Sequence, residues 1–202
     1  MKKLFWIFMV SFLAIGQAPN LLAEDAPVGM PPMDEKMVEA MKLMAPGENH
    51  AKLAQFIGKF KATTTMWMDA ASAPQISEGI SESKWILGGR FVQQTFTGQF
   101  MGKPFEGMGI IGYDNVAKEY NSIWLDSVST GIMKATAKYD DATKVFSEEG
   151  SFSCPLTGRK DNAYKSVTTV VDADHYTYEM WHDDVKTGKN YKAMAISYER
   201  IA

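Results

Sequence analysis

The sequence predicts a mainly β fold, an antiparallel up-and-down barrel of ten strands preceded by one or two short helices. From Gly58 onwards, segments rich in Thr, Val, Ile and aromatic residues recur about every 10 to 15 residues, which is typical of strands. Gly, Pro, Asn and Asp separate these segments and predict tight turns. Short connections favour pairing of each strand with the next, and closure into a barrel removes exposed sheet edges.

The N-terminal sequence MKKLFWIFMVSFLAIGQAPNLLAEDAP has the pattern of a secretory signal. Lys2 and Lys3 precede an apolar run that is too short to span a bilayer comfortably. Cleavage is expected after Ala23, with cleavage after Gly16 as the alternative. We therefore expect an exported protein, periplasmic or extracellular, with no stable membrane span after signal cleavage; an uncleaved membrane anchor is the alternative.

The expected organisation is a signal peptide over residues 1–23, a Pro- and Gly-containing linker over 24–33, and a single barrel domain with its helices over 34–202. Loss of the two signal lysines leaves 19 basic against 24 acidic residues, a net charge of −5. The bases are scattered among acids, which argues against nucleic acid as a partner. Cys154 is the only cysteine, so an intramolecular disulfide is impossible and the fold depends on packing.

Two short helices are predicted before the strands. Asp34 has the position of an N-cap for a helix that ends at Pro46-Gly47. Its methionines share one face, which we expect to pack as an adaptable lid across a barrel mouth; Cu(I) binding and a partner-binding face are the alternatives. These methionines are Met37, Met41 and Met44. The second helix, ENHAKLAQFIG, offers Leu53, Phe56 and Ile57 to a core.

The ten predicted strands follow the alternation of apolar and polar residues. They cover residues 59–69, 77–87, 90–100, 105–113, 119–127, 131–139, 143–152, 162–172, 174–182 and 189–201.

Arg200 is expected on the same face of the last strand as the apolar residues Met194, Ile196 and Tyr198. Near the start of the barrel, F-I-G-K-F places Gly58 and Phe60 at the beginning of the first strand. This arrangement resembles the G-x-W segment and C-terminal Arg of lipocalin-like (calycin) barrels, with Phe60 in place of Trp. The resemblance implies that Gly58, Phe60 and Arg200 close the barrel floor. An Arg200 that faces an anionic ligand is the alternative.

A series of motifs identifies the family that the chain resembles. They are P-G-E-x-H-x-x-L-x-x-F-x-G (46–58), W-x-L-G-G-R-F (85–91), M-G-x-P-F-E-G-x-G-x-x-G-Y-D (101–114), W-x-D (124–126), P-L-T-G (155–158) and Y-E-R (198–200). The chain is similar to the uncharacterised bacterial domain-of-unknown-function family fifteen-seventy-nine over about residues 46–201. The resemblance implies a lipocalin-like barrel and no particular chemistry. The chain departs from the family at Phe60, where Trp is common, and at Cys154, where an acid is expected.

Residues 107–112, G-M-G-I-I-G, match the phosphate-binding fingerprint of dinucleotide-binding proteins. That fingerprint requires a helix after the glycines, whereas Asp114-Asn115 predicts a turn followed by another strand. The glycines are instead expected within a barrel strand. Gly107 and Gly109 share a strand face and would leave room there for a neighbouring aromatic ring or a ligand.

The three histidines, His50, His175 and His182, suggest no definite site. A histidine on a late strand is where haem-binding barrels place an axial ligand, so haem is kept as an alternative cofactor and none is favoured. A zinc site requires more ligands than these positions offer, so no metal site is predicted. The pairs Asp140-Asp141, Glu148-Glu149 and Asp183-Asp184 fall at predicted turns or exposed strand ends and are expected to be solvated surface charges. Adjacent strand residues point to opposite faces, so none of these pairs is predicted to act as a convergent acid/base pair.

The leading functional prediction is non-enzymatic binding of a small, mainly apolar molecule inside the barrel. No catalytic residue is predicted. The candidate lining residues are Trp85, Phe91, Phe96, Met108, Trp124, Met133, Tyr178 and His182. One alternative is a haem-binding or isomerase-type barrel enzyme that uses His182 or His175 with Tyr178. The other is an envelope interaction protein with a filled barrel and a Met-rich binding helix, its protein partner unknown.

Overall fold

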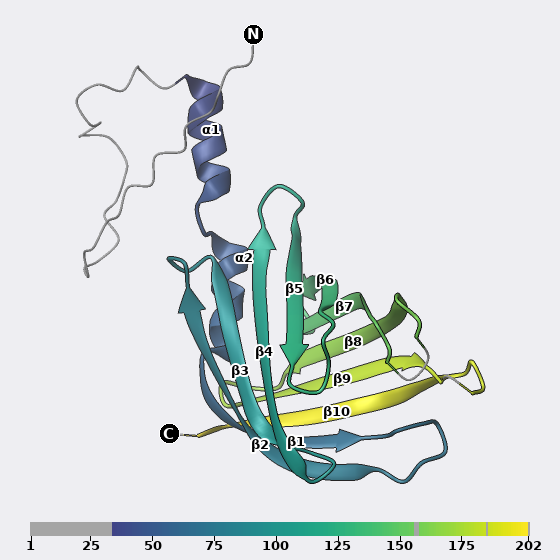
Figure 1. Ribbon diagram of the computed structural model, residues 1–202. Helices are drawn as coiled ribbons and strands as arrows, with labels where there is room; N and C mark the ends of the chain where they lie inside the picture. Colours follow the sequence, from purple (N-terminus) through teal and green to yellow (C-terminus); the bar gives the residue numbers. More distant parts are fainter. Residues whose placement is uncertain (1–33, 156–157, 185, 202) are drawn as a thin grey trace.

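The computed structural model describes residues 34–155, 158–184 and 186–201. The predicted signal peptide (1–23) and linker (24–33) lie outside the described residues. The described chain forms a closed antiparallel barrel in which every strand pairs with its neighbours in sequence and β1 also pairs with β10 (Figure 1). The elements are α1 (Glu35–Met44), α2 (Glu48–Ala51), the 3-10 helix η1 (Lys52–Phe56), β1 (Gly58–Met66), β2 (Gln75–Ile86), β3 (Phe91–Phe100), β4 (Lys103–Asp114), β5 (Glu119–Asp126), β6 (Met133–Asp140), β7 (Val145–Phe152), β8 (Asn162–Val170), β9 (His175–Asp183) and β10 (Asn190–Ile201).

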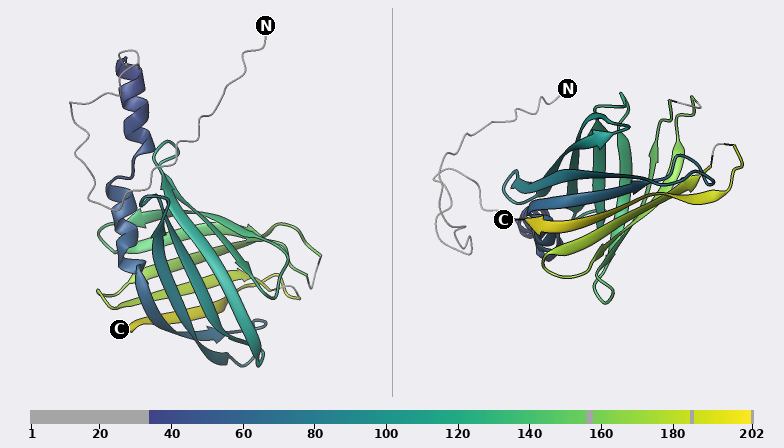
Figure 2. Two further views of the ribbon diagram at one scale, coloured as in Figure 1. Left: turned by 60° about the vertical axis from the view of Figure 1, so that its left-hand side comes forward. Right: turned by 90° about the horizontal axis from the view of Figure 1, so that it is seen from below.

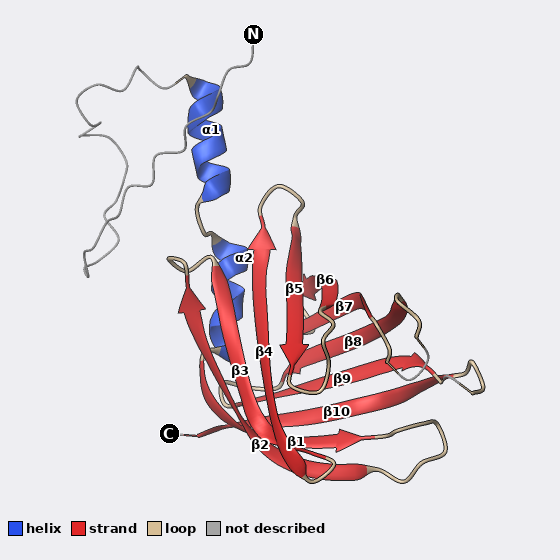
Figure 3. Cartoon of the chain, in the orientation of Figure 1, coloured by secondary structure: helices blue, strands red, loops and turns tan. Residues whose placement is uncertain are grey.

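The predicted fold class and all ten predicted strands are confirmed, and each strand boundary lies within about three residues of its prediction. Figure 3 shows that strands make the whole wall and that the helices gather at one side of it. The connections after β1, β3, β5, β7 and β9 form one end of the barrel, which we call the mouth. The connections after the even-numbered strands form the other end, which we call the plugged end.

The β3–β4 connection at the mouth explains one difference from the predicted boundaries. Met101 and Gly102 both have positive φ, 51° and 73°, which is the geometry of a two-residue type I′ hairpin. The turn therefore ends earlier than predicted, and Lys103 and Pro104 already belong to β4.

The plugged end is closed by α2 and η1. Leu53 is fully buried against Val92, Tyr120 and Phe146, and Phe56 packs against the same cluster. The backbone carbonyl of Asn49, in α2, accepts a 2.9 Å hydrogen bond from the Tyr120 hydroxyl. The prediction that the second helix contributes to a core is confirmed.

The first helix does not cover the barrel. α1 begins as predicted at Asp34, whose carboxylate accepts a 2.8 Å hydrogen bond from the Met37 amide. However, none of its residues is buried, and Figure 1 and the left view of Figure 2 show α1 extending away from the strands. The prediction that its methionine face packs as a lid is wrong, because α2 and η1 already close the near end and α1 lies beyond them.

Candidate functional site: the barrel interior

The barrel encloses a cavity of about 540 Å³ that reaches solvent at the mouth. Small residues on the inward faces of β1 and β2 leave this space, because Ala62, Thr64, Ser81 and Ser83 are all buried and fill little volume. Phe56 lies at the floor of the cavity, above the plug. The apolar part of the wall includes Phe96, Phe105, Trp124, Met133, Met180, Met194 and Ile196.

Trp124 is positioned by two glycines of the adjacent strand. Gly109 is its register partner, and a Cβ on Gly109 would come within 3.2 Å of the Trp124 ring. A Cβ on Gly107 would overlap the ring outright. The indole nitrogen donates a 3.1 Å hydrogen bond to Asp126, which fixes the ring in this plane. The expectation that Gly107 and Gly109 make room for an aromatic ring is confirmed.

Glu148, on β7, points into the barrel and is the centre of a polar cluster. Its Oε1 accepts hydrogen bonds from the Tyr164 hydroxyl at 3.1 Å and the Ser166 hydroxyl at 3.0 Å. Its Oε2 accepts one from the Ser122 hydroxyl at 2.9 Å. The cluster joins β5, β7 and β8 across the cavity wall and gives the apolar interior an anionic group.

A second polar group lies nearer the plug. The Gln94 amide donates a 2.8 Å hydrogen bond to the Ser81 hydroxyl. The Tyr176 ring, 6% exposed, stacks on Tyr198 with 4.2 Å between ring centroids. Tyr176 lines the same cavity, whereas its hydroxyl is fully buried in the wall beside Ser81 and Gln94.

The interior tyrosines remain protonated. Burial raises the pKa of Tyr178 and of Tyr198 well above the ordinary value, and the Glu148 carboxylate raises that of Tyr178 further. Burial and Glu148 act in the same direction on the pKa of Tyr164. These hydroxyls therefore act as hydrogen-bond donors at neutral pH, and none is prepared to act as a base.

The described lining contains no lysine, arginine or histidine. Its only ionisable acids are Glu148 and Asp126. Among the described residues no group of three or more His, Cys, Asp or Glu side chains could hold a metal ion. No helix within the described ranges is long and apolar enough to cross a membrane.

Half of the candidate lining residues lie on the cavity wall: Phe96, Trp124, Met133 and Tyr178. Their role in binding a ligand stays a prediction. Phe91 and Met108 do not line the cavity, because they occupy the outward positions of their strands. Phe91 precedes the buried Val92, and Met108 lies between the inward Gly107 and Gly109.

Two further candidates lie inside the barrel but away from the lining. Trp85 packs with Leu53 and Val92 at the plugged end, beneath the cavity. His182 lies near the mouth, where its ring meets Phe152 and Tyr191 edge-on.

The other two histidines also lie away from the cavity and form hydrogen bonds with other residues. His175 is exposed at the plugged end, where Asp172 accepts its hydrogen bond at 2.8 Å and raises its pKa. His50 is buried in the plug, and its Nδ1 accepts a 3.0 Å hydrogen bond from the Gly47 amide. Burial lowers the pKa of His50. No histidine of the described chain lines the cavity.

The three residues predicted to close the barrel floor, Gly58, Phe60 and Arg200, lie next to one another. Arg200 lies over the Phe60 ring, and its Nη1 donates a 2.7 Å hydrogen bond to the Ile57 carbonyl. Gly58 has a φ of 118°, a conformation that favours glycine, and a side chain there would collide with the guanidinium. The alternative of Arg200 facing a ligand does not fit this geometry, since Arg200 is absent from the cavity lining.

Two acids that were predicted to be surface charges are not on the surface. Glu148 points inwards, and Asp184 is 4% exposed, where it accepts a 3.0 Å hydrogen bond from the Ala70 amide. The sequence did indicate the orientation of Glu148. Phe146 is an apolar residue that points inwards from β7, and Glu148, two residues further along the strand, points to the same face.

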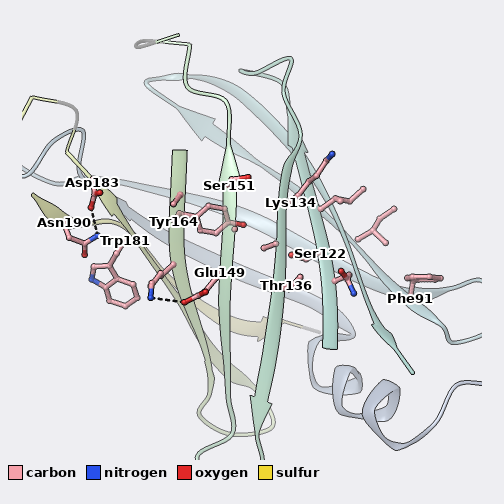
Figure 4. Close-up of a pocket in the computed structure, with 17 residues that line it drawn as sticks. Phe91, Ser122, Lys134, Thr136, Glu149, Ser151, Tyr164, Trp181, Asp183 and Asn190 are labelled. Carbon is pink, nitrogen blue, oxygen red and sulfur yellow. Dashed lines mark hydrogen bonds and ion pairs between the residues drawn. The ribbon is translucent and has the colours of Figure 1, made fainter. Parts of the chain in front are cut away.

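A second depression, of about 890 Å³, runs along the barrel wall and is lined by residues of each strand from β3 to β10 (Figure 4). Two pairs of its polar side chains are already bonded to each other: Lys165 pairs with Glu149 at 2.9 Å, and the Asn190 amide donates to Asp183 at 3.2 Å. Lys165 and Glu149 are 75% and 73% exposed, so this surface lacks the enclosure that binding sites normally have. The interior is the stronger candidate site.

Comparison with known protein families shows to which family the chain belongs. The family described as "Protein of unknown function (DUF1579)" matches residues 45–200, about three quarters of the chain. The chain belongs to this family. DUF1579 is the family that the motif series resembled, so that prediction is confirmed. No curated protein matches the chain.

Solved structures place this DUF1579 member among known barrels. The crystal structure of Rv2717c from M. tuberculosis superposes with a TM-score of 0.60 at 14% identity, covering 78% of this chain and 100% of the other. The S-type phycobiliprotein lyase CPES from Guillardia theta superposes with a TM-score of 0.55 at 7% identity, covering 80% and 97%. At these identities the likeness concerns the fold alone.

Proposed function

We propose that this protein is an exported binding protein that holds a small, mainly apolar molecule inside its barrel. The observation that carries the proposal is the 540 Å³ cavity, which is plugged at one end, open at the other and lined mainly by apolar and aromatic side chains. Sites for small molecules commonly have volumes of about 300–1,000 Å³ and a few placed polar groups. A filled barrel, as an interaction module would have, lacks such a space.

The lyase of similar fold shares the barrel architecture, and at 7% identity its own action does not distinguish a binding protein from an enzyme. The geometry of the interior argues against the histidine-based enzyme alternatives. His175 and His182 are both absent from the described cavity lining, and the interior tyrosines have raised pKa values.

Binding can be tested with Nile red, a neutral apolar dye whose emission rises in apolar surroundings. We expect saturable binding by the purified mature protein, with partial quenching of its tryptophan fluorescence, because Trp124 lines the cavity. Ser77→Trp would fill the cavity from the lining and should weaken dye binding at least about tenfold. Glu78→Trp, on the exposed face one residue further, is the matched control and should bind as the wild type does. Equal binding by both variants would place the dye outside the barrel.

The natural occupant can be sought by native mass spectrometry of protein purified from the envelope of its own host. We expect a co-purifying mass that dissociates on unfolding. Export itself is tested by fractionation: the wild type should appear outside the cytoplasm, and a chain that lacks residues 2–23 should remain inside.

A further inference from the structure

We infer that the barrel selects apolar molecules that carry an ammonium or another strong hydrogen-bond donor, and that Glu148 is the residue that recognises this group. The inference rests on the proposed binding function and adds the chemistry of the ligand.

The hydrogen bonds of Glu148 leave one acceptor position unused. An ionised carboxylate offers about four lone-pair positions. Tyr164 and Ser166 occupy two on Oε1, whereas Ser122 occupies only one on Oε2. Because Glu148 lines the cavity, the remaining position is available to a molecule inside it. A donor on the ligand would complete the set.

The charge of Glu148 has no counter-ion among the described lining residues. Three hydroxyls stabilise a partly buried carboxylate, but a cation offsets more of the cost of removing the charge from water. The lining holds no Lys, Arg or His, and its other acid, Asp126, adds charge of the same sign. An ammonium group is therefore favoured in this cavity, and a ligand carboxylate is repelled.

The aromatic rings of the cavity wall also favour a cationic ligand. Rings of Tyr178 and Trp124 line the cavity with Glu148, and the faces of such rings attract cations. The cavity thus fits an amphipathic amine better than a fatty acid.

The test compares dodecylamine, dodecanol and dodecanoate, which share one chain length, as competitors of Nile red at neutral pH. For the wild type we expect the amine to displace the dye at concentrations about 10- to 100-fold lower than the carboxylate, as one charge-assisted hydrogen bond allows. Glu148→Gln keeps the shape of the side chain and removes its charge, so the amine and the alcohol should then compete about equally. Glu148→Asp should keep the amine preference in weakened form.

Glu149→Gln is the matched control, since Glu149 is the next residue, points outwards and pairs with Lys165. It should leave the order of the three competitors unchanged. A wild type that prefers dodecanoate, or an amine preference that persists in Glu148→Gln, would overturn the inference while dye binding still supports the barrel as a binding site. Failure of the wild type to bind Nile red would instead remove the proposed function. If Glu148→Gln does not fold, the order in which the three competitors displace Nile red from the wild type still tests the amine preference, and Glu148→Asp tests the role of Glu148.

Discussion

The guanidinium of Arg200 lies over the ring of Phe60, with 4.5 Å between the Arg200 Cζ and the ring centroid. The same group donates to the Ile57 carbonyl at 2.7 Å and to the Gln55 carbonyl at 3.3 Å. These carbonyls belong to the end of the plug, whereas Arg200 belongs to the last strand. One side chain therefore joins the first strand, the last strand and the plug.

Arg200→Lys should lower the free energy of unfolding by about 1–3 kcal/mol, because an ammonium cannot bond both carbonyls while it covers the ring. Urea denaturation measures the change. Arg90→Lys is the control: Arg90 donates to the Met44 carbonyl at 3.2 Å at the end of the unburied α1, so its replacement should have little effect. Equal losses in both variants would show that the position of Arg200 is unimportant.

The sequence predicted the wall of this barrel well because strands and turns depend on local composition. It predicted the orientation of single side chains less well. Phe91 and Met108 were placed inside on the strength of their apolar character, whereas alternation from Val92 and from Gly107 places them outside. Glu148 was placed outside because the Glu148-Glu149 pair was expected at a turn or an exposed strand end. In each case, alternation along the strand decides the orientation more reliably than residue type.

Gly107→Ala tests whether the glycine positions Trp124. The added methyl group would overlap the indole ring, so Trp124 must shift into the cavity. We expect a loss of about 1–3 kcal/mol in unfolding free energy, weaker Nile red binding and a changed tryptophan emission maximum. At Gly131 the nearest atom to a new Cβ is 3.4 Å away, so Gly131→Ala should behave like the wild type. Unchanged emission in Gly107→Ala would contradict this packing.

Asp184 should make the barrel mouth sensitive to acid. Hydrogen bonds from the Ala70 and Thr187 amides lower the pKa of Asp184 from its ordinary value to about 2. Because the folded pKa lies below the unfolded one, this carboxylate stabilises the fold above about pH 4, and the contribution is lost as the pH falls through 2.

Asp184→Asn should therefore be less stable than the wild type at pH 6, and the difference should shrink as the pH falls from 4 to 2. Urea denaturation of both proteins over this pH range provides the measurement. Asp183→Asn, at the neighbouring exposed position, should show a much smaller difference at pH 6. A gap between wild type and Asp184→Asn that stays constant down to pH 2 would rule out this role of the carboxylate.

The orientation of α1 could not be predicted from the sequence. An apolar helix face indicates that the helix packs against something, but it does not indicate which surface that is. Met37, Met41 and Met44 are 54%, 51% and 70% exposed, although they have the spacing of a packed stripe. What holds α1 is the Asn115 amide, which donates to the Leu43 and Ala45 carbonyls at 2.9 Å each, together with Arg90. These bonds lie at the end of the helix, next to the barrel.

Deletion of residues 34–44 should therefore change the unfolding free energy of the barrel by no more than about 0.5 kcal/mol, as is usual for exposed segments. Nile red binding should also be preserved, since the cavity opens at the opposite end. Leu53→Ala is the contrasting variant: Leu53 is fully buried in the plug, and its truncation should cost about 2–5 kcal/mol. A deletion that destabilises the barrel as much as Leu53→Ala would mean that the methionine face packs on the barrel in solution.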